Sequence, residues 1–207
     1  MLSSLLPVTK NLIIINVLIF FGTVLWEADP SLRAADVESI LDLKRDGLSA
    51  WPPGSPFFRP FQIVTGMFMH AGIGHLFFNM LGMFFFGSMV ERTLGPQRYF
   101  TLYMAAGIGG LLVFWLTGYL MDTQAPVLGA SGAVYGVLLS LAYTNPDTRV
   151  QLLFPPIPIK LGYLAIGLVA FDLFRGWTGT SGNVASFAHI GGALVGLGLT
   201  AWWTRRG

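Results

Sequence analysis

The sequence contains no cysteine and few charged side chains. Only 11% of its 207 residues are Asp, Glu, Lys or Arg, against about 25% in an average soluble domain. Without cysteine, disulfide frameworks, thiolate nucleophiles and Cys-based metal sites are excluded. So few charges cannot cover a soluble globule, and with 54% hydrophobic residues intrinsic disorder is excluded too. We therefore expect a polytopic membrane protein with one domain, residues 1–207.

The sequence also lacks any concentration of basic residues. Lys and Arg number 12 against 10 Asp and Glu, for a net charge of +2. Because the basic residues are scattered and form no stripe, no nucleic-acid partner is expected. They are expected to lie in the loops and to set the orientation of the chain in the bilayer.

Long apolar segments are present instead. A bilayer core is about 30 Å thick and takes about 20 helical residues to cross. We expect an all-α fold with six transmembrane helices, the fourth of them short. The segments lie at about 9–26, 61–90, 97–121, 130–144, 158–174 and 184–203. No small-residue cleavage site follows the first segment, which is therefore expected to be retained.

Two parts of this pattern depart from simple spans. The second segment is too long, so its early part, 61–74, is expected to dip into the membrane as a loop, with the helix starting near His75. Residues 27–60 contain five prolines and are expected to form a long first external loop. Within this loop, 34–48 is expected to form a short amphipathic helix at the membrane interface.

The positive charges of the short loops predict the orientation. With the N-terminus in the cytoplasm, Arg175 is the single basic residue of the outer short loops. The inner side then holds Lys10, Arg92, Arg98, Arg149, Lys160, Arg205 and Arg206. This bias predicts an integral multi-pass protein of the cell (inner) membrane with both termini in the cytoplasm.

Ser131 begins the fourth segment, within Gly129-Ala130-Ser131-Gly132. This segment covers only about 22 Å at 1.5 Å per residue, roughly 8 Å less than the bilayer core. The helix is therefore expected to begin below the outer surface, after a loop that lines a polar cavity. The glycines would allow a tight turn and close approach of a substrate. A lone serine in a membrane helix is more often a packing residue.

His189 lies about five residues into the sixth segment. Gly192 and Gly196 share its helix face, and Gly132 and Gly136 form a matching face on the fourth segment. Small residues four apart let helix backbones approach closely, which would bring the imidazole to the serine hydroxyl. Packing without any chemistry is the alternative interpretation of these glycines.

Two further polar residues lie near the outer end of the second segment. His75 and Asn79 are four residues apart and share a helix face. Because the second, fourth and sixth segments run in the same direction, His75, Ser131 and His189 are expected in one layer. For His75 or Asn79 taken alone, an interhelical hydrogen bond is the alternative role.

Such a layer has the parts needed to hydrolyse a peptide bond. A serine hydroxyl is a weak nucleophile until a neighbouring histidine accepts its proton, which predicts Ser131 as nucleophile and His189 as base. His75, Asn79 and the Ser131 backbone N–H are expected to donate hydrogen bonds to the developing oxyanion.

The sequence offers one residue to orient the base. Tyr135, one turn after Ser131, is expected to pack against the His189 imidazole, with plain core packing as the alternative. Asp172 is the nearest acidic residue by topology, but it lies at the end of the fifth segment and is expected at the membrane interface. We therefore expect a Ser–His dyad without an acidic third member.

Four motifs, in order, resemble those of the rhomboid intramembrane serine proteases. In this chain, His70-x4-His75-x3-Asn79 resembles the family's second-span motif. Gly87-x3-Glu91-x3-Gly95 resembles a structural motif at the end of that span. Gly129-Ala130-Ser131-Gly132, followed by Tyr135, resembles the family's active-site motif. Ala188-His189-x2-Gly192-x3-Gly196 resembles its sixth-span motif. The resemblance covers roughly residues 57–200.

The resemblance implies a rhomboid-like bundle of the basic six-span bacterial form. It implies a serine endopeptidase that cleaves single-pass transmembrane protein substrates in the lipid bilayer, without a cofactor or metal. The implied dyad is Ser131 and His189, and the implied oxyanion site is His75, Asn79 and the Ser131 N–H. The implied supporting residues are Gly129, Tyr135, His70, Gly132 and Gly192. The motifs specify neither the natural substrate nor the oligomeric state.

Two positions outside the dyad also bear on this resemblance. Family members often have Trp-Arg in the first loop, where this chain has Phe61-Gln62, so the loop is expected to seat differently in the lipid. Glu91 and Arg92, with Arg98 nearby, are expected to form a structural ion-pair cluster on the cytoplasmic side.

Two other classes of function remain open. A proteolytically inactive relative, acting as a binding or quality-control module, would have the same fold. Such relatives lack the serine or the histidine, whereas this chain has both. A small transporter or channel would also use a polar layer, but no pair of broken helices recurs in two halves of the sequence.

Overall fold

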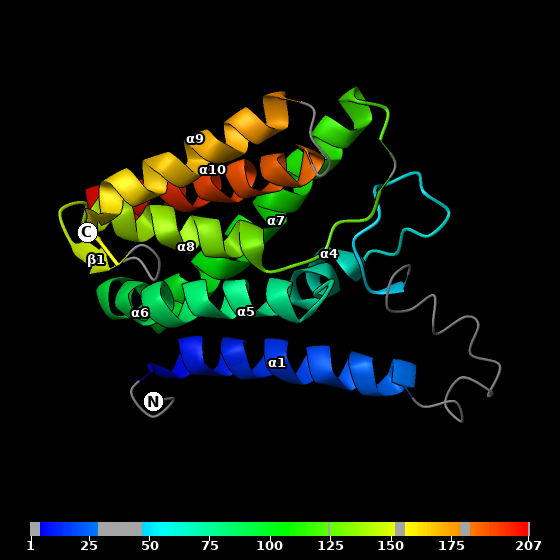
Figure 1. The fold of residues 1–207 in the computed structure, drawn as a ribbon, viewed down its shortest axis with the longest axis horizontal. Helices are drawn as coiled ribbons and strands as arrows, with labels where there is room; N and C mark the ends of the chain where they lie inside the picture. Colours follow the sequence, from blue (N-terminus) through cyan, green and yellow to red (C-terminus); the bar gives the residue numbers. More distant parts are fainter. Residues whose placement is uncertain (1–4, 29–46, 124, 152–155, 179–182, 207) are drawn as a thin grey trace.

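A computed structural model of the chain describes residues 5–28, 47–123, 125–151, 156–178 and 183–206 (Figure 1). Most of the interfacial helix expected at 34–48 lies outside these residues. The elements in chain order are α1 (Pro7–Ala28), α4 (Gln62–Thr65), η3 (Gly66–Phe68), α5 (Ile73–Gly82), η4 (Met83–Gly87), α6 (Ser88–Leu94), α7 (Pro96–Leu120), α8 (Ser131–Thr144), β1 (Arg149–Gln151), β2 (Pro158–Lys160), α9 (Leu161–Trp177) and α10 (Asn183–Arg206).

The expected all-α polytopic membrane fold is confirmed. Four helical stretches are long and apolar enough to cross a membrane, and they lie at 7–25, 73–94, 96–120 and 185–206. The fourth expected segment is the shorter apolar helix α8, with 14 residues, and α9 has 17 residues. Large apolar side chains such as Leu18, Phe78 and Ile166 lie exposed on the outside of the bundle, as expected where a helix surface faces lipid.

The second expected segment is divided in the way that its length predicts. Its early part forms the short helices α4 and η3, and the long helix begins at Ile73, two residues before His75. From there α5, the π-helical stretch η4 and α6 continue as one helical span to Leu94. Gly95, with φ of 80°, ends it, because glycine adopts a positive φ more readily than other residues.

The fifth expected segment, 158–174, is displaced along the chain. Its first residues form strand β2, which pairs with β1 in an antiparallel two-stranded sheet. Helix α9 then runs from Leu161 to Trp177, so it ends three residues later than expected. This small sheet is the one departure from helix among the described elements, and prolines that cannot continue a helix account for it.

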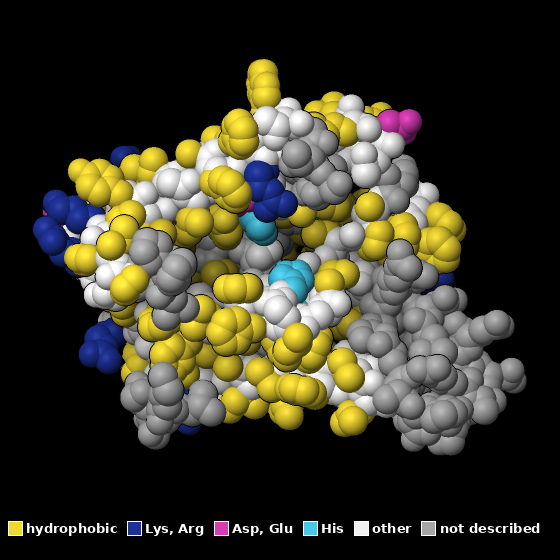
Figure 2. Space-filling model, viewed as in Figure 1, with side chains coloured by type: hydrophobic (Ala, Val, Ile, Leu, Met, Phe, Trp, Pro, Cys, Tyr) yellow, Lys and Arg dark blue, Asp and Glu magenta, His cyan; other side chains and the backbone are white. Residues whose placement is uncertain are grey.

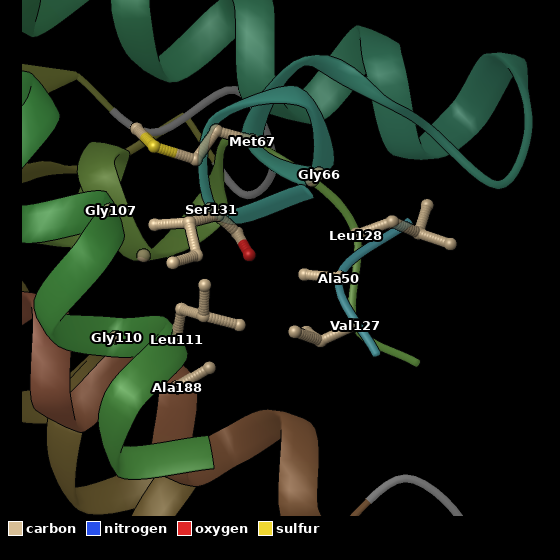
Figure 3. A pocket seen from close by; sticks show the side chains of 13 residues that line it. Ala50, Gly66, Met67, Gly107, Gly110, Leu111, Val127, Leu128, Ser131 and Ala188 are labelled. Atoms are coloured by element: carbon tan, nitrogen blue, oxygen red, sulfur yellow. The ribbon is translucent and has the colours of Figure 1, made fainter. Parts of the chain in front are cut away.

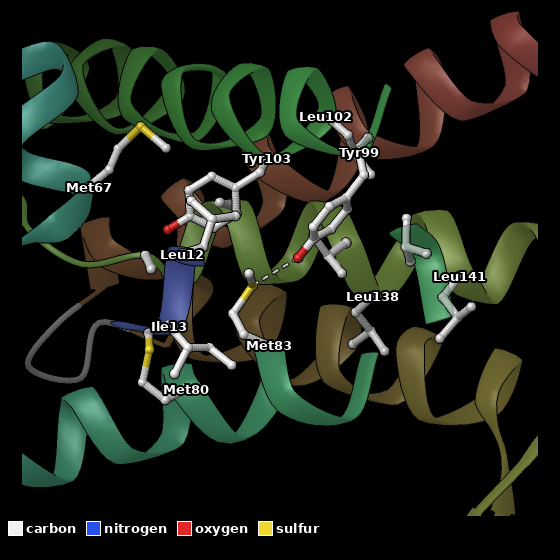
Figure 4. Packing of buried hydrophobic residues seen from close by; sticks show 14 of the residues in the cluster. Leu12, Ile13, Met67, Met80, Met83, Tyr99, Leu102, Tyr103, Leu138 and Leu141 are labelled. Carbon is white, nitrogen blue, oxygen red and sulfur yellow. Dashed lines mark hydrogen bonds between the residues drawn. The ribbon is translucent and has the colours of Figure 1, made fainter. Parts of the chain in front are cut away.

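The core of the bundle lies between helices that are distant in sequence. Helix α10 packs against α7, α8 and α9, and α7 also packs against α8. Away from α10, Tyr99 of α7 meets Met83 of η4, and Tyr103 lies buried in the same cluster (Figure 4). The Tyr99 hydroxyl lies 3.8 Å from the Met83 sulfur. Burial of these large side chains fixes η4 and α7 against each other.

The cytoplasmic end expected for the second span holds α1 in place. The Glu91 carboxylate accepts hydrogen bonds from the backbone N–H groups of Val8 and Thr9, at 3.0 and 2.8 Å, and from the Thr9 hydroxyl at 2.8 Å. Glu91 therefore caps the first turn of α1, where N–H groups lack intrahelical acceptors. The expected ion-pair cluster is wrong: among the described residues Glu91 pairs with neither Arg92 nor Arg98.

Candidate active site

Ser131 is the first residue of α8, and a sharp turn precedes it. Gly129 has φ of 119°, and a side chain there would collide with the His75 ring. The Gly129 N–H donates to the Gly66 carbonyl at 2.9 Å, which ties the turn to η3. The Ser131 N–H is one of the first N–H groups of a helix, which have no acceptor within the helix. Ser131 therefore provides both a hydroxyl group and a backbone N–H that has no acceptor within the helix.

Helices α8 and α10 approach each other at their glycines. A side chain at Gly192 would collide with the backbone of Gly132, and one at Gly196 would collide with the backbone of Gly136. The matching glycine faces expected from the sequence therefore do meet. Close backbone approach lets residues near the start of both helices touch.

The His189 imidazole lies next to Ser131. Its Nε2 is 2.9 Å from the Ser131 Oγ, within the range expected of a nucleophile and its base. The Tyr135 ring stacks on the imidazole with the ring centroids 4.5 Å apart and an interplanar angle of 11°. This is the contact that the one-turn spacing between Ser131 and Tyr135 predicts.

Asp172 also contacts the histidine, so the expectation that no acidic residue lies beside His189 is wrong. Its Oδ2 is 3.0 Å from the His189 Nδ1, and its side chain is 3% exposed. The error has a simple cause. Because α9 continues to Trp177, Asp172 lies five residues from the helix end, or about 8 Å. His189 is six residues from the adjoining start of α10, so both lie at a similar depth.

The second-span residues lie on the opposite side of Ser131 from α10. The His75 ring lies against Gly129, two residues before the serine. Asn79 is buried, and its amide donates to the His75 carbonyl at 3.0 Å. His70 is buried before α5, and its ring centroid is 5.1 Å from that of His75. Burial, with a smaller contribution from His75, lowers the pKa of His70 to about 4, so its ring is neutral near pH 7.

A pocket opens beside Ser131 on the side of the first loop (Figure 3). Gly107 and Gly110 of α7 and Ala188 of α10 line one wall, and Ala50 and Val127 line another. Ala50 and Val127 exchange backbone hydrogen bonds of 2.8 and 3.0 Å, so two loops distant in sequence join to form this wall. On the molecular surface, two histidine side chains flank a hollow at the centre of one face (Figure 2).

Gln62 organises the first loop, and the sequence does not indicate this role. Its side chain is fully buried. The amide donates to the carbonyls of Gly47 and Phe57, both at 2.9 Å, and its oxygen accepts from the Arg59 N–H at 3.0 Å. The neighbouring Phe61 is half exposed. Where family members often have Trp-Arg, this chain has Phe61-Gln62, and the Gln62 side-chain amide lies at the centre of the loop.

Comparison with known proteins supports the interpretation of the motifs. The chain matches a model of the Rhomboid domain over residues 58–206. It is 37% identical over 153 residues to RHOMBOID-like protein 12, mitochondrial, of Arabidopsis thaliana, covering 66% of this chain and 44% of that protein. It is 32% identical over 144 residues to Rhomboid protein 1, mitochondrial, of Saccharomyces cerevisiae, covering 69% and 41%.

A bacterial protein is also similar. The Rhomboid protease GluP of Bacillus subtilis is 33% identical over 137 residues, covering 66% of this chain and 24% of that protein. The chain spans less than half the length of each of these three relatives. The matched domain covers the span from the first loop to α10, including Ser131 and His189. By this match the chain belongs to the rhomboid family.

Proposed function

We propose that this protein is an intramembrane serine protease that cleaves single-pass transmembrane proteins. The observation that carries the proposal is the 2.9 Å contact between the Ser131 Oγ and the His189 Nε2. Two helices brought together at glycines hold this pair next to a pocket. Family membership and the relative named as a rhomboid protease support the same activity.

The first half of the reaction follows from these positions. His189 takes the proton of the Ser131 hydroxyl, and the oxygen attacks the scissile carbonyl carbon. The tetrahedral intermediate carries its negative charge on the former carbonyl oxygen. The Ser131 N–H, the His75 ring and the Asn79 amide are the proposed donors to that oxygen. His189 then gives its proton to the leaving amine, and an acyl-enzyme forms.

In the second half of the reaction, water takes the place of the serine hydroxyl as the nucleophile. His189 takes a proton from the water, whose oxygen attacks the acyl carbonyl, and the proton returns to the Ser131 oxygen as the ester bond breaks. The substrate reaches the site from the lipid, since Ser131 begins a helix of 14 residues, shorter than a bilayer crossing. We place the protein in the cell (inner) membrane with both termini in the cytoplasm, as the loop charges predict.

Labelling with a fluorophosphonate probe tests the nucleophile. Detergent-purified protein is expected to react at Ser131 and to cleave a model single-span substrate. Ser131→Ala and His189→Ala are expected to abolish both reactions. Ser140→Ala is the matched control, because Ser140 lies on the same helix but accepts a hydrogen bond from Thr200 at 2.7 Å. An unlabelled wild-type protein that is folded would identify an inactive relative, and cleavage by Ser131→Ala would exclude the proposed nucleophile.

A further inference from the structure

We propose that Asp172 is the positioning residue for His189, so that the site works as a Ser–His–Asp triad. The inference rests on the proposed function and adds a residue that the dyad does not contain. Side chains from three helices are in contact in series: the Ser131 hydroxyl of α8, the His189 ring of α10 and the Asp172 carboxylate of α9. The His189 Nε2 lies 2.9 Å from the Ser131 Oγ, and the His189 Nδ1 lies 3.0 Å from the Asp172 Oδ2.

The carboxylate determines which ring nitrogen carries the proton. An ionised carboxylate accepts hydrogen bonds and donates none. Facing Asp172 Oδ2, the His189 Nδ1 must therefore carry its hydrogen, and the lone pair is left on Nε2. Nε2 is the nitrogen that faces the Ser131 hydroxyl. Without a fixed acceptor at Nδ1, the proton would also occupy Nε2, and that tautomer cannot accept the serine proton.

Asp172 is placed for this role at an energetic cost. It is the one acidic residue of α9, in an otherwise apolar helix except for Arg175 one turn later. A buried carboxylate is strongly unfavourable unless hydrogen bonds satisfy it. Tyr135 and Ser186 also lie beside the carboxylate, in addition to His189. A group held in this way is preorganised, because its partners are fixed before a substrate binds.

Tyr135 connects the two supports of the base. Its ring stacks on the imidazole, and its side chain also lies beside the Asp172 carboxylate. The imidazole is therefore fixed in its plane by Tyr135 and along its Nδ1 direction by the carboxylate. When Nε2 takes the proton from the Ser131 Oγ, the ring becomes an imidazolium. The Nδ1 hydrogen stays on the ring, and Asp172 stabilises the new positive charge without being protonated itself.

Kinetics of an isosteric variant test the inference. Asp172→Asn is expected to lower kcat by roughly 10² to 10⁴-fold, because the amide can donate to Nδ1 and favour the wrong tautomer. KM is expected to change less than about 3-fold, since Asp172 does not touch the substrate. Asp147→Asn is the matched control: Asp147 is 81% exposed and pairs with Lys160. An unchanged kcat in Asp172→Asn would overturn the inference.

The tautomer itself is measurable in the unmodified protein, so the test does not depend on the variant folding. The chain has 3 histidines, and His189→Ala identifies the His189 signals in a ¹⁵N-histidine NMR spectrum. We expect hydrogen on Nδ1 and a bare Nε2, and we expect Asp172→Asn to move the hydrogen to Nε2 while the His70 and His75 signals stay in place. A proton on Nε2 in the wild type would exclude the triad.

These outcomes separate the two proposals. If Ser131→Ala is inactive and Asp172→Asn is as fast as the wild type, the protease function stands and the positioning role falls. If the wild type neither reacts with the probe nor cleaves a substrate, the proposed function falls, whatever the tautomer. A His189 tautomer set by Asp172 in a protein without activity would leave a structural bond only, which overturns the positioning role as well.

Discussion

At the scale of single residues, the polar side chains in contact with Ser131 and His189 have definite partners. His189 meets Ser131, Tyr135 and Asp172, and Asn79 bonds to the turn of helix before it. In a membrane, a polar side chain inside a span is costly and is expected to be satisfied. These side chains are thus held in place by their partners, which favours reactions that depend on preorganised donors.

Asn79→Ala tests whether this amide is an oxyanion donor. Loss of one donor is expected to lower kcat by roughly 10 to 10³-fold and to leave KM nearly unchanged. Asn16→Ala is a matched control, because Asn16 is also fully buried and its amide also bonds to the carbonyl four residues earlier, at 2.8 Å. It lies on α1, away from Ser131, and is expected to affect stability alone. Equal kcat values for the two variants would return Asn79 to a packing role.

The buried His70 predicts how stability depends on pH. Its pKa of about 4 in the fold is below the ordinary value of 6.5, so between these values the unfolded chain binds the proton more readily. The free energy of unfolding is therefore expected to be full above about pH 6.5 and to fall as the pH drops toward 4. His70→Gln is expected to remove part of this dependence in thermal unfolding scans. If the wild type and His70→Gln showed the same pH dependence of thermal unfolding, His70 would not be its source.

At the scale of elements, the contact between α8 and α10 decides whether the site exists. Ser131 and His189 are 58 residues apart in the chain, and no loop brings them together. The absence of side chains at Gly132, Gly136, Gly192 and Gly196 lets the two backbones approach. Only with such an approach does a histidine side chain bridge from one helix to the first turn of the other.

A single methyl group at this contact is expected to separate the pair. Gly192→Ala would collide with the Gly132 backbone, so α10 must shift, and probe labelling at Ser131 is expected to slow by at least about 10-fold. Gly198→Ala on the same helix meets no atom within 4 Å and is expected to keep full labelling, with stability equal or higher by up to about 1 kcal/mol. Equal labelling of both variants would show that close approach is dispensable.

At the scale of the whole molecule, the helical segments alternate in direction. α1 therefore begins and α10 ends at the same end of the bundle (Figure 1). Trp177, at the end of α9, lies at the opposite end and is 91% exposed. If the loop charges orient the chain as predicted, that opposite end faces outside.

The absence of cysteine makes this orientation directly testable. With no native thiol, Lys10→Cys and Arg206→Cys are expected to react with a membrane-impermeant maleimide from the cytoplasmic side only. Trp177→Cys is expected to react from the outer side only, and the unmodified protein is the blank. Labelling of Lys10→Cys from outside would reverse the predicted topology.

The sequence alone determined much of this protein. Apolar segments separated by charged loops predicted a multi-helix membrane fold, because the bilayer constrains span length and backbone hydrogen bonding so strongly. Short motifs predicted the Ser131, His189 and Tyr135 cluster, since residues three or four apart share a helix face. The matching glycines predicted which two helices approach.

Only the tertiary structure decided which further residues reach this cluster. Asp172 was misplaced because its depth depends on where α9 ends, and a shift of three residues moves a side chain by about 5 Å along the axis and rotates it around the helix. Glu91 and Gln62 bond to backbone groups far along the chain, and no local pattern encodes such contacts. Helix periodicity fixes faces and approximate depths, whereas the partner of a buried polar group follows from how separate helices and loops pack.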